Sequence, residues 1–146
     1  MNMFKKFIKK CHVYLLIFGL ISAAFFIPFD LVISDERAFQ VVDEYGIPLK
    51  NCIVEHDWIQ YALEFRDSET RVTDDNGFVF LPKRTIRTSW AELIRASYVK
   101  LQLYGIHSSF NSDDVVALSA SGYKTEIIYS RYWRGNKIIL KKELPL

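Results

Sequence analysis

Residues 73–82 read TDDNGFVFLP, and this stretch decides the class of fold. Asn76 and Gly77 tolerate the left-handed backbone of a tight turn, and the Asp74 carboxylate can accept hydrogen bonds from the backbone of that turn. Apolar residues typical of a strand follow as far as Leu81, and Pro82 ends them. The stretch therefore predicts a hairpin in which two strands meet antiparallel.

Upstream of this turn, short apolar segments alternate with turn residues, as in sheet proteins. Residues 38–43 form a first candidate strand. Gly46 can take a positive φ in the turn that follows, and Pro48 prevents continued pairing. Residues 52–65 then predict one long strand, or two strands with a bend between them.

Downstream, a strand is expected at residues 115–120 and is ended by a turn at Ser121 and Gly122 that leads into Tyr123. Two final strands are expected at residues 126–133 and 137–141. Arg134, Gly135 and Asn136 between them resemble a second hairpin connection. About seven strands in roughly 105 residues predict an all-β, antiparallel β-sandwich.

Four segments occur in a characteristic order: VVDEYGIPLKNCIV, TDDNGFVFLP, ALSASGYKT and IILKK. Over residues 39–142 this order resembles the carboxypeptidase regulatory-like domain of the transthyretin-like (prealbumin-like) superfamily. The resemblance implies a transthyretin-like sandwich and a mostly non-enzymatic role. Such domains support, orient or attach neighbouring parts of secreted and membrane proteins, and some relatives bind sugars or other ligands. The resemblance supplies no catalytic residues.

The chain departs from the family pattern at residues 83–114, an insert in place of a short connection. Ser89 and Glu92 form a capping box, and apolar residues then recur every three to four positions, which predicts an amphipathic helix over residues 90–101. Over residues 83–101 the sequence has one acidic residue, Glu92, and five basic ones: Lys83, Arg84, Arg87, Arg95 and Lys100. The more ordinary arrangement is a helix packed across one end of the sandwich with a solvated basic face. The alternative is a helix lying on an anionic membrane surface or an acidic partner.

The amino-terminal part reads VYLLIFGLISAAFFIPF over residues 13–29, which is 17 residues without a charge. At 1.5 Å per residue it reaches about 25 Å, short for a bilayer core of about 30 Å unless flanking lysines extend it. We expect residues 1–12 to be a basic cytoplasmic tail, residues 13–33 a transmembrane signal anchor, and residues 34–146 an extracytoplasmic domain, periplasmic in a Gram-negative cell.

A cleaved secretory signal is the competing interpretation of the same segment. Ser22, Ala23 and Ala24 are small residues that follow an apolar stretch, as at a signal cleavage site. The mature chain would then begin at Phe25 with an exposed apolar end, which a spanning helix would bury. Both interpretations export the domain.

The charge distribution argues against nucleic-acid binding. Four of the 19 basic residues are Lys5, Lys6, Lys9 and Lys10, and setting these and Asp30 aside leaves 15 basic residues against 16 of the 17 acidic ones. A nucleic-acid-binding domain normally has a basic face. Cys11 and Cys52 lie on opposite sides of the apolar segment, so we expect neither a disulfide between them nor a structural zinc site.

The candidate residues for chemistry are few. His12 flanks the apolar segment, which leaves His56 and His107 for a metal site, and we expect a structural role for both. Asp74, Asp75 and Asn76 lack the spacing of a calcium loop, and residues 119–122, SASG, lack the first glycine of a nucleophile elbow. We therefore expect no enzymatic activity, no metal and no cofactor.

Aromatic and arginine residues gather near the end of the chain, as at many binding surfaces. They are Tyr129, Arg131, Tyr132, Trp133 and Arg134. On a strand, alternate residues share a face, so at least one group could point outward, although core packing is the more ordinary role for Trp133. Trp90 and Arg95 of the insert are further candidate contact residues.

These observations predict a non-catalytic, membrane-anchored envelope protein that acts as a structural or protein-interaction module with an envelope protein partner. The alternative is a small-ligand or glycan-binding module, secreted if the signal is cleaved.

Overall fold

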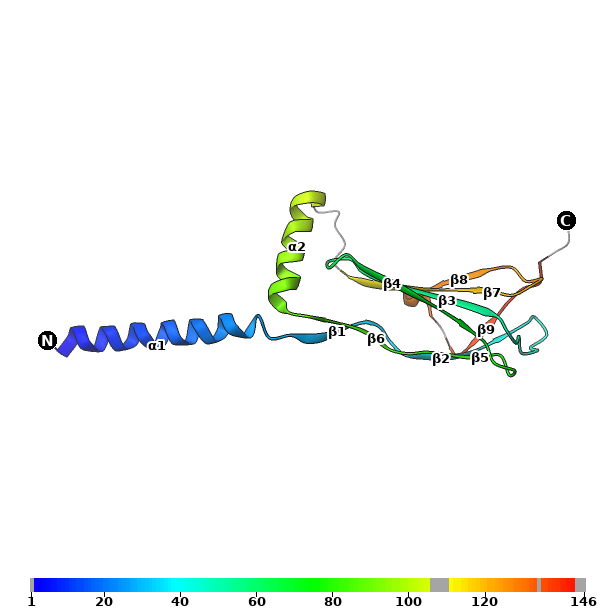
Figure 1. Cartoon of the computed structure of the whole chain (residues 1–146), viewed down its shortest axis with the longest axis horizontal. Coiled ribbons are helices and arrows are strands. Elements are labelled where there is room, and N and C mark those ends of the chain that lie inside the picture. Colours follow the sequence, from blue (N-terminus) through cyan, green and yellow to red (C-terminus); the bar gives the residue numbers. More distant parts are fainter. Residues whose placement is uncertain (1, 106–110, 134, 144–146) are drawn as a thin grey trace.

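Figure 1 shows the computed structural model of the chain, which describes residues 2–105, 111–133 and 135–143, and within them the side chains from residue 12 onwards. Two helices and nine strands in three sheets make up this described part. In chain order the elements are α1 (Asn2–Ala24), β1 (Phe29–Ser34), β2 (Arg37–Val42), β3 (Ile53–Gln60), β4 (Phe65–Val72), β5 (Phe78–Leu81), β6 (Arg84–Thr88), α2 (Trp90–Tyr104), β7 (Ser112–Ser119), β8 (Glu126–Tyr129), the 3₁₀ helix η2 (Ser130–Tyr132) and β9 (Lys137–Ile139).

The predicted all-β sandwich is confirmed, but it is not wholly antiparallel, because β9 pairs with β2 in the parallel direction. A four-stranded sheet in the order β4-β3-β7-β8 lies against a three-stranded sheet in the order β5-β2-β9. Alternate residues of each strand point inward, so Val54 of β3, Leu118 of β7 and Phe39 of β2 are fully buried. These residues belong to one hydrophobic core between the two sheets.

The third sheet is a two-stranded ribbon that extends the sandwich at one end. β1 pairs antiparallel with β6, directly beyond the β2–β5 pair. The ribbon carries α1 and α2 at its far end, where the Ala91 amide donates to the Phe25 carbonyl at 3.0 Å. The Phe29 and Trp90 rings also meet there, with centroids 5.2 Å apart. Both helices are thus connected to the sandwich through the ribbon.

Helix α1 ends earlier than the anchor that was predicted at residues 13–33. It ends at Ala24, and residues 25–27 continue only with i to i−3 hydrogen bonds before Pro28, which cannot donate to a helix. Residues 29–33, which we expected inside the anchor, belong to strand β1 because β6 supplies a hydrogen-bonded partner for them. In the described part of the chain, no helix combines the length and the apolar character needed to cross a membrane.

The turn at residues 74–77 has the expected local geometry. Gly77 has φ of 73°, and Asp74 Oδ1 accepts from the amides of Asn76 and Phe78 at 2.9 and 2.7 Å. The predicted hairpin is nevertheless wrong, because β4 pairs with β3 and β5 pairs with β2. The turn carries the chain from one sheet to the other.

The second predicted hairpin is also wrong. β8 ends at Tyr129 and pairs with β7, and η2 follows it in place of a continued strand. β9 pairs with β2 in the parallel direction. Gly135 has a positive φ of 78°, as the turn requires, and Arg134 lies outside the described residues.

The other predicted turn residues occupy turns. Gly46 has φ of 82°, and Pro48 forms an isolated bridge with Val42. Gly122 has φ of 79°, and Tyr123 packs against the core while bridging to Lys142.

The insert at residues 83–114 contains the expected helix and one strand that was not expected. α2 starts after Ser89, whose hydroxyl accepts from the Glu92 amide at 3.3 Å. Glu92 binds the Thr88 hydroxyl at 3.1 Å in place of the Ser89 amide that a capping box would use. Strand β6 precedes the helix. α2 does not bury a face across the end of the sandwich, since none of its residues is buried.

Gly77 should be the most sensitive glycine of the sandwich. A Cβ at this position would lie 2.5 Å from the Val41 carbonyl oxygen, in addition to the cost of a positive φ. We expect Gly77→Ala to lower the free energy of unfolding by more than about 2 kcal/mol. Gly46→Ala is the matched control, because Gly46 has a similar φ and open space around it, and should cost about 1 kcal/mol. Equal losses in denaturant titrations would contradict this account.

Candidate functional site

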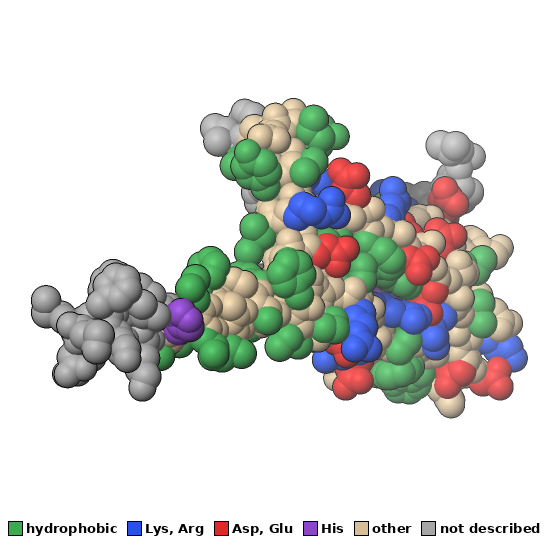
Figure 2. All heavy atoms as spheres, turned by 60° about the vertical axis from the view of Figure 1, so that its left-hand side comes forward, with side chains coloured by type: hydrophobic (Ala, Val, Ile, Leu, Met, Phe, Trp, Pro, Cys, Tyr) green, Lys and Arg blue, Asp and Glu red, His purple; other side chains and the backbone are tan. Residues whose placement is uncertain are grey.

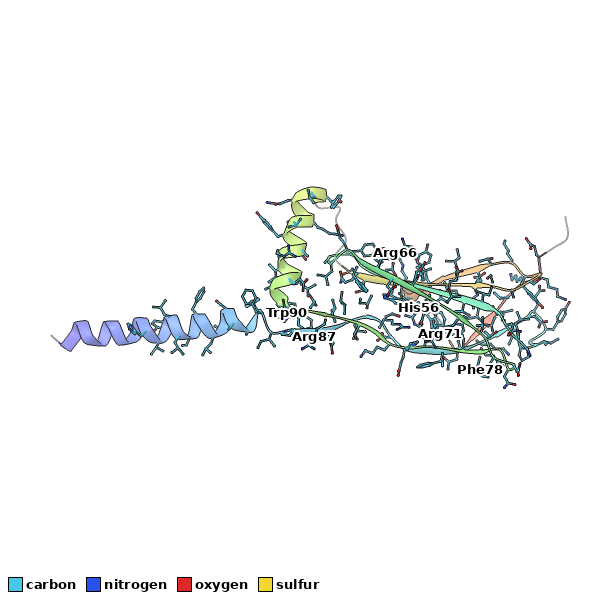
Figure 3. All side chains as sticks on the ribbon, viewed as in Figure 1. His56, Arg66, Arg71, Phe78, Arg87 and Trp90 are labelled. Carbon is cyan, nitrogen blue, oxygen red and sulfur yellow. The ribbon has the colours of Figure 1, made fainter. Side chains whose placement is uncertain are left out.

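A cluster of buried and half-buried polar and charged side chains lies where the ribbon meets the four-stranded sheet. We call it the neck cluster. Three members come from the ribbon and its junction with the sandwich, and three from the sheet: Ser34, Arg37 and Arg84, and His56, Glu69 and Asp114. They converge because β1 contacts both β3 and β7 and because His56 lies opposite Glu69 in the β3–β4 ladder. Figure 3 places His56 inside the sandwich, and Arg87 and Trp90 at the far end of the ribbon.

The Asp114 carboxylate is the centre of the neck cluster. Ser34 Oγ donates to its Oδ2 at 2.6 Å, His56 Nε2 lies 3.2 Å from the same oxygen, and Arg37 Nη1 lies 2.8 Å away. Burial alone would raise the pKa of Asp114. Hydrogen bonds to His56, Ser34, Ser130 and Arg37 outweigh burial and hold the pKa of this carboxyl well below its usual range.

Glu69 forms the second acidic point of the neck cluster. It accepts from Arg84, and from Arg71 Nε at 3.1 Å. Burial raises the pKa of Glu69, but its hydrogen bonds and charge attraction with Arg84 and Arg71 lower it by more. The Arg84 guanidinium also lies 4.9 Å from the centroid of the Trp58 ring.

His56 lies between the two carboxylates and is fully buried. Its Nε2 lies 3.2 Å from Ser34 Oγ, and its Nδ1 lies 3.7 Å from Glu69 Oε1, which is too long for a hydrogen bond. The side chains of Ser34, His56 and Asp114 therefore meet, but Ser34 and Asp114 both contact the same ring nitrogen of His56, Nε2. A catalytic triad places the nucleophile and the carboxylate on opposite nitrogens of the ring. This geometry suits a buried ion network and does not provide a relay to Ser34.

Other residues weighed for chemistry are also in structural settings. Burial raises the pKa of the Cys52 thiol, against the effect of a hydrogen bond to the Ser119 backbone, so the thiol is held in its unreactive form. Within the described residues, no group of three or more His, Cys, Asp or Glu side chains is placed to hold a metal ion. His107 lies outside those residues.

The predicted aromatic surface is partly assembled at the end of β8. The Tyr129 and Tyr132 rings meet edge to face, with centroids 6.5 Å apart, and the Arg131 guanidinium lies 5.5 Å from each ring. The turn of η2 produces this arrangement, since a continued strand would have put Tyr129 and Tyr132 on opposite faces. We call these three residues the tyrosine surface.

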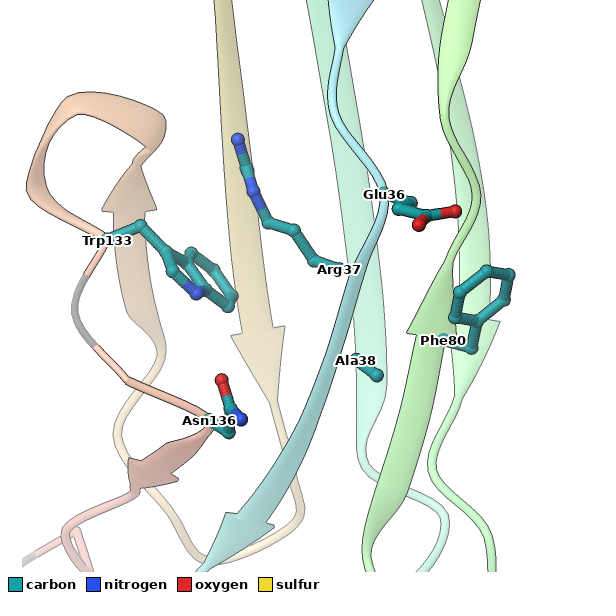
Figure 4. Close-up of a pocket in the computed structure, with 6 residues that line it drawn as sticks. All are labelled: Glu36, Arg37, Ala38, Phe80, Trp133 and Asn136. Atoms are coloured by element: carbon teal, nitrogen blue, oxygen red, sulfur yellow. The ribbon is translucent and has the colours of Figure 1, made fainter.

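Trp133 has a different role from the two tyrosines. Its ring packs edge-on against Phe39 at 4.8 Å and is part of the sandwich packing. It also lines two hollows of the surface. One has a volume of about 450 Å³ and includes Tyr129, Tyr132 and Ile139 in its wall. The other is about 440 Å³, and Figure 4 shows Arg37 and Trp133 pointing towards each other beside it, with the guanidinium 5.1 Å from the ring centroid.

The predicted contact residues thus fall into two separate groups. Trp90 and Arg95 lie on α2, beyond the ribbon, whereas the tyrosine surface lies on the sandwich. Arg134 lies outside the described residues. The neck cluster was not predicted. One feature of the sequence could have indicated it: His56 alternates with the apolar residues Val54 and Trp58, which places its side chain on the inward face of the strand.

No protein-family model and no curated protein matches the sequence. Among solved structures, the chain is similar to 3-chlorocatechol 1,2-dioxygenase from Rhodococcus opacus 1CP, with 16% sequence identity and a TM-score of 0.45. The similarity covers 75% of this chain, which spans 61% of the length of the dioxygenase chain.

Asp114 should control the acid stability of the protein. Because its folded pKa is depressed, its stabilisation is complete above the unfolded value of about 4 and is lost as the pH falls below that value. We expect Asp114→Asn to lower the free energy of unfolding by about 3 kcal/mol at pH 7 and to flatten the loss of stability on acidification. Part of the loss of stability on acidification should remain in this variant, because the pKa of Glu69 is also lowered in the folded protein.

The matched control for this prediction is Asp57→Asn. Asp57 pairs with Arg66 on the same sheet at 3.7 Å, but its side chain is 49% exposed, so the change should cost less than about 1 kcal/mol. Chemical denaturation of the full-length chain across the acid range measures both variants. An unchanged acid limb in Asp114→Asn would show that the neck cluster does not stabilise the fold.

Proposed function

We propose that this chain is a non-catalytic, membrane-anchored envelope module, in which α1 and the residues after it attach the sandwich to a membrane. The amino terminus then lies in the cytoplasm, and the sandwich lies outside it, in the periplasm of a Gram-negative cell. The resemblance in sequence to carboxypeptidase regulatory-like domains is part of this proposal, because such domains commonly attach or orient neighbouring parts of membrane proteins.

One observation carries the proposal: α1 extends from the ribbon with its apolar side chains uncovered. Leu16 is 65% exposed, Phe18 70% and Phe26 71%, within a stretch of 17 uncharged residues. Figure 2 shows hydrophobic side chains along this part of the helix. Contiguous exposed apolar surface of this kind marks a contact with a membrane or with another protein. The 23 residues of α1 extend about 35 Å, and the uncharged residues 11–24 account for about 21 Å of this, so the proposal needs the lysines before them to reach the lipid headgroups of a bilayer whose core is about 30 Å thick.

The neck cluster supports the structural part of the proposal. A domain that is held by one ribbon needs a fixed ribbon if its orientation to the membrane is to be defined. Arg37 and Ser34 on the ribbon side are bound to Asp114 of the sheet, and Arg84 is bound to Glu69. Two separate contacts, one buried at Asp114 and one half-buried at Glu69, therefore hold the ribbon to the sandwich. The tyrosine surface on the sandwich is left free for an envelope protein partner.

The anchor is tested by charging the apolar segment. Leu16→Arg combined with Leu20→Arg should move the protein out of the carbonate-resistant membrane fraction, since each arginine costs about 2.5–3.5 kcal/mol at the centre of a spanning helix. The unaltered chain should remain in that fraction at its full-length mass, with a carboxy-terminal tag open to protease from outside the cytoplasm. Tyr45→Arg, at a residue 77% exposed on the sandwich, is the matched control and should stay in the membrane.

A soluble unaltered chain would overturn the anchor. If its amino terminus were Phe25, the segment would be a cleaved secretory signal and the sandwich a secreted domain.

The second candidate function is binding of a small ligand or glycan. The hollow of about 450 Å³ beside the tyrosine surface favours it, because exposed aromatic rings beside a concave surface can stack on sugars. The Trp133 ring in the same wall provides a fluorescent reporter.

Titration with a panel of envelope glycans tests this function. A binding glycan should change the tryptophan fluorescence, and Tyr132→Ala should weaken its affinity on the order of tenfold. Tyr45→Ala is the control, since Tyr45 is an exposed tyrosine outside this hollow. Flat titrations across the panel would eliminate glycan binding and leave the tyrosine surface to a protein partner.

A further inference from the structure

Helix α2 presents an apolar surface that no described part of the chain covers. Trp90 is 56% exposed, Ile94 54%, Tyr98 59% and Leu101 48%. Their spacing of four, four and three residues aligns them along one side of the helix, and we call them the α2 stripe. None of the 15 residues of this helix is fully buried, and the side that carries Lys100 is half-buried.

The direction of the α2 stripe follows from the contact between α2 and the sandwich. Lys100 Nζ lies 3.7 Å from Glu64 Oε1 in the turn between β3 and β4, so the Lys100 side of the helix faces the sandwich. At 100° per residue, Ile94 lies about 120° and Tyr98 about 160° around the helix from Lys100. These two side chains therefore point away from the sandwich.

The start of α2 is joined to the end of the apolar segment. The Ala91 amide donates to the Phe25 carbonyl, and Trp90 contacts Phe29. Figure 1 shows α2 running crosswise to α1 from this junction. A helix placed crosswise at the end of a spanning segment lies in the plane of the bilayer surface, at the depth of the lipid headgroups.

The charges near the α2 stripe favour anionic lipid. Arg95, at about 140° from Lys100, also points away from the sandwich. Arg87 is exposed on β6 just before the helix, opposite the exposed Asp30 of β1. Glu92 is the only acidic residue of α2, and its carboxylate accepts from the Thr88 hydroxyl. Tryptophan and tyrosine beside arginine are typical of helices at the membrane interface.

From these contacts we infer that α2 binds the outer surface of the membrane through the α2 stripe, with Arg87 and Arg95 on anionic headgroups. The inference rests on the proposed function, because it needs α1 to cross the same bilayer. It adds a second point of attachment at one end of the ribbon. The sandwich then has one orientation to the membrane, set by α1, α2 and the neck cluster.

The test uses the full-length chain in vesicles of phosphatidylcholine, with and without phosphatidylglycerol, made with brominated or ordinary acyl chains. Bromine quenches a tryptophan only where the ring reaches the lipid. The share of quenching due to Trp90 is the difference between the unaltered chain and Trp90→Phe. We expect a substantial Trp90 share, larger when phosphatidylglycerol is present.

A double variant, Ile94→Asp with Tyr98→Asp, should reduce the Trp90 share about tenfold, because it removes apolar burial at the interface. It should leave the fold intact, since neither side chain is buried. Leu103→Asp is the matched control. Leu103 is 69% exposed and lies about 180° around the helix from Ile94, so its change should leave the Trp90 share as it is.

Two results would overturn the inference, and they are distinguishable. A chain that stays with the vesicles after carbonate extraction while its Trp90 share is zero keeps the anchor but leaves the α2 stripe in water, available to a protein partner. A chain that carbonate releases from the vesicles has no anchor, and the proposed function fails together with the inference.

Discussion

The carboxylate of Asp114 joins the two parts of the molecule, and the arrangement of the rest depends on it. Its oxygens accept a hydrogen bond from Ser34 and pair with Arg37, both at the junction of the ribbon with the sandwich. They also contact His56 of the neighbouring strand. An acidic side chain that is 3% exposed is stable only because these groups replace the water it has lost. Without them the ribbon would keep its backbone continuation into β2 and β5 and the contact of Arg84 with Glu69, but it would lose its polar contacts with Asp114 of β7. With them, the helices at the far end of the ribbon have a defined position relative to the core.

This arrangement separates the molecule into three regions with different physical character. The sandwich buries a compact apolar core around Phe39, Val54 and Leu118. The neck replaces apolar contacts with a network of charges, which has directional requirements that apolar packing lacks. Beyond the neck, α1 and α2 expose apolar side chains that the sandwich does not cover. In the proposed attachment, the membrane covers the apolar side chains of both helices, while the tyrosine surface remains on the sandwich. Recognition would then occur next to the neck, since Arg131 of the tyrosine surface pairs with Asp113, the residue before Asp114.

Local sequence patterns predicted local structure correctly and strand pairing incorrectly. Asp74 and Gly77 form the expected turn, and Gly135 takes the expected positive φ, because these geometries depend on a few adjacent residues. The partner of each flanking strand depends on contacts far away in the chain. Gly77 approaches the Val41 carbonyl so closely that its turn packs against β2, and the chain crosses there between sheets. Two strands next to a tight turn are therefore not always a hairpin.

The sequence by itself determined the all-β class, the helix that Ser89 begins, the turn residues and the uncharged apolar segment, since each follows from periodicity or from the backbone preference of single residues. Only the tertiary structure decided where the apolar segment stops being helical, because β6 offers a partner to the residues after Pro28. It also decided the neck cluster, whose members Ser34, His56 and Asp114 are separated by 22 and 58 positions. From sequence alone, a charged residue in a strand is predicted to be exposed. Its buried partners become known only with the neighbouring strands, and the pairing of those strands depends on the burial of the whole sheet.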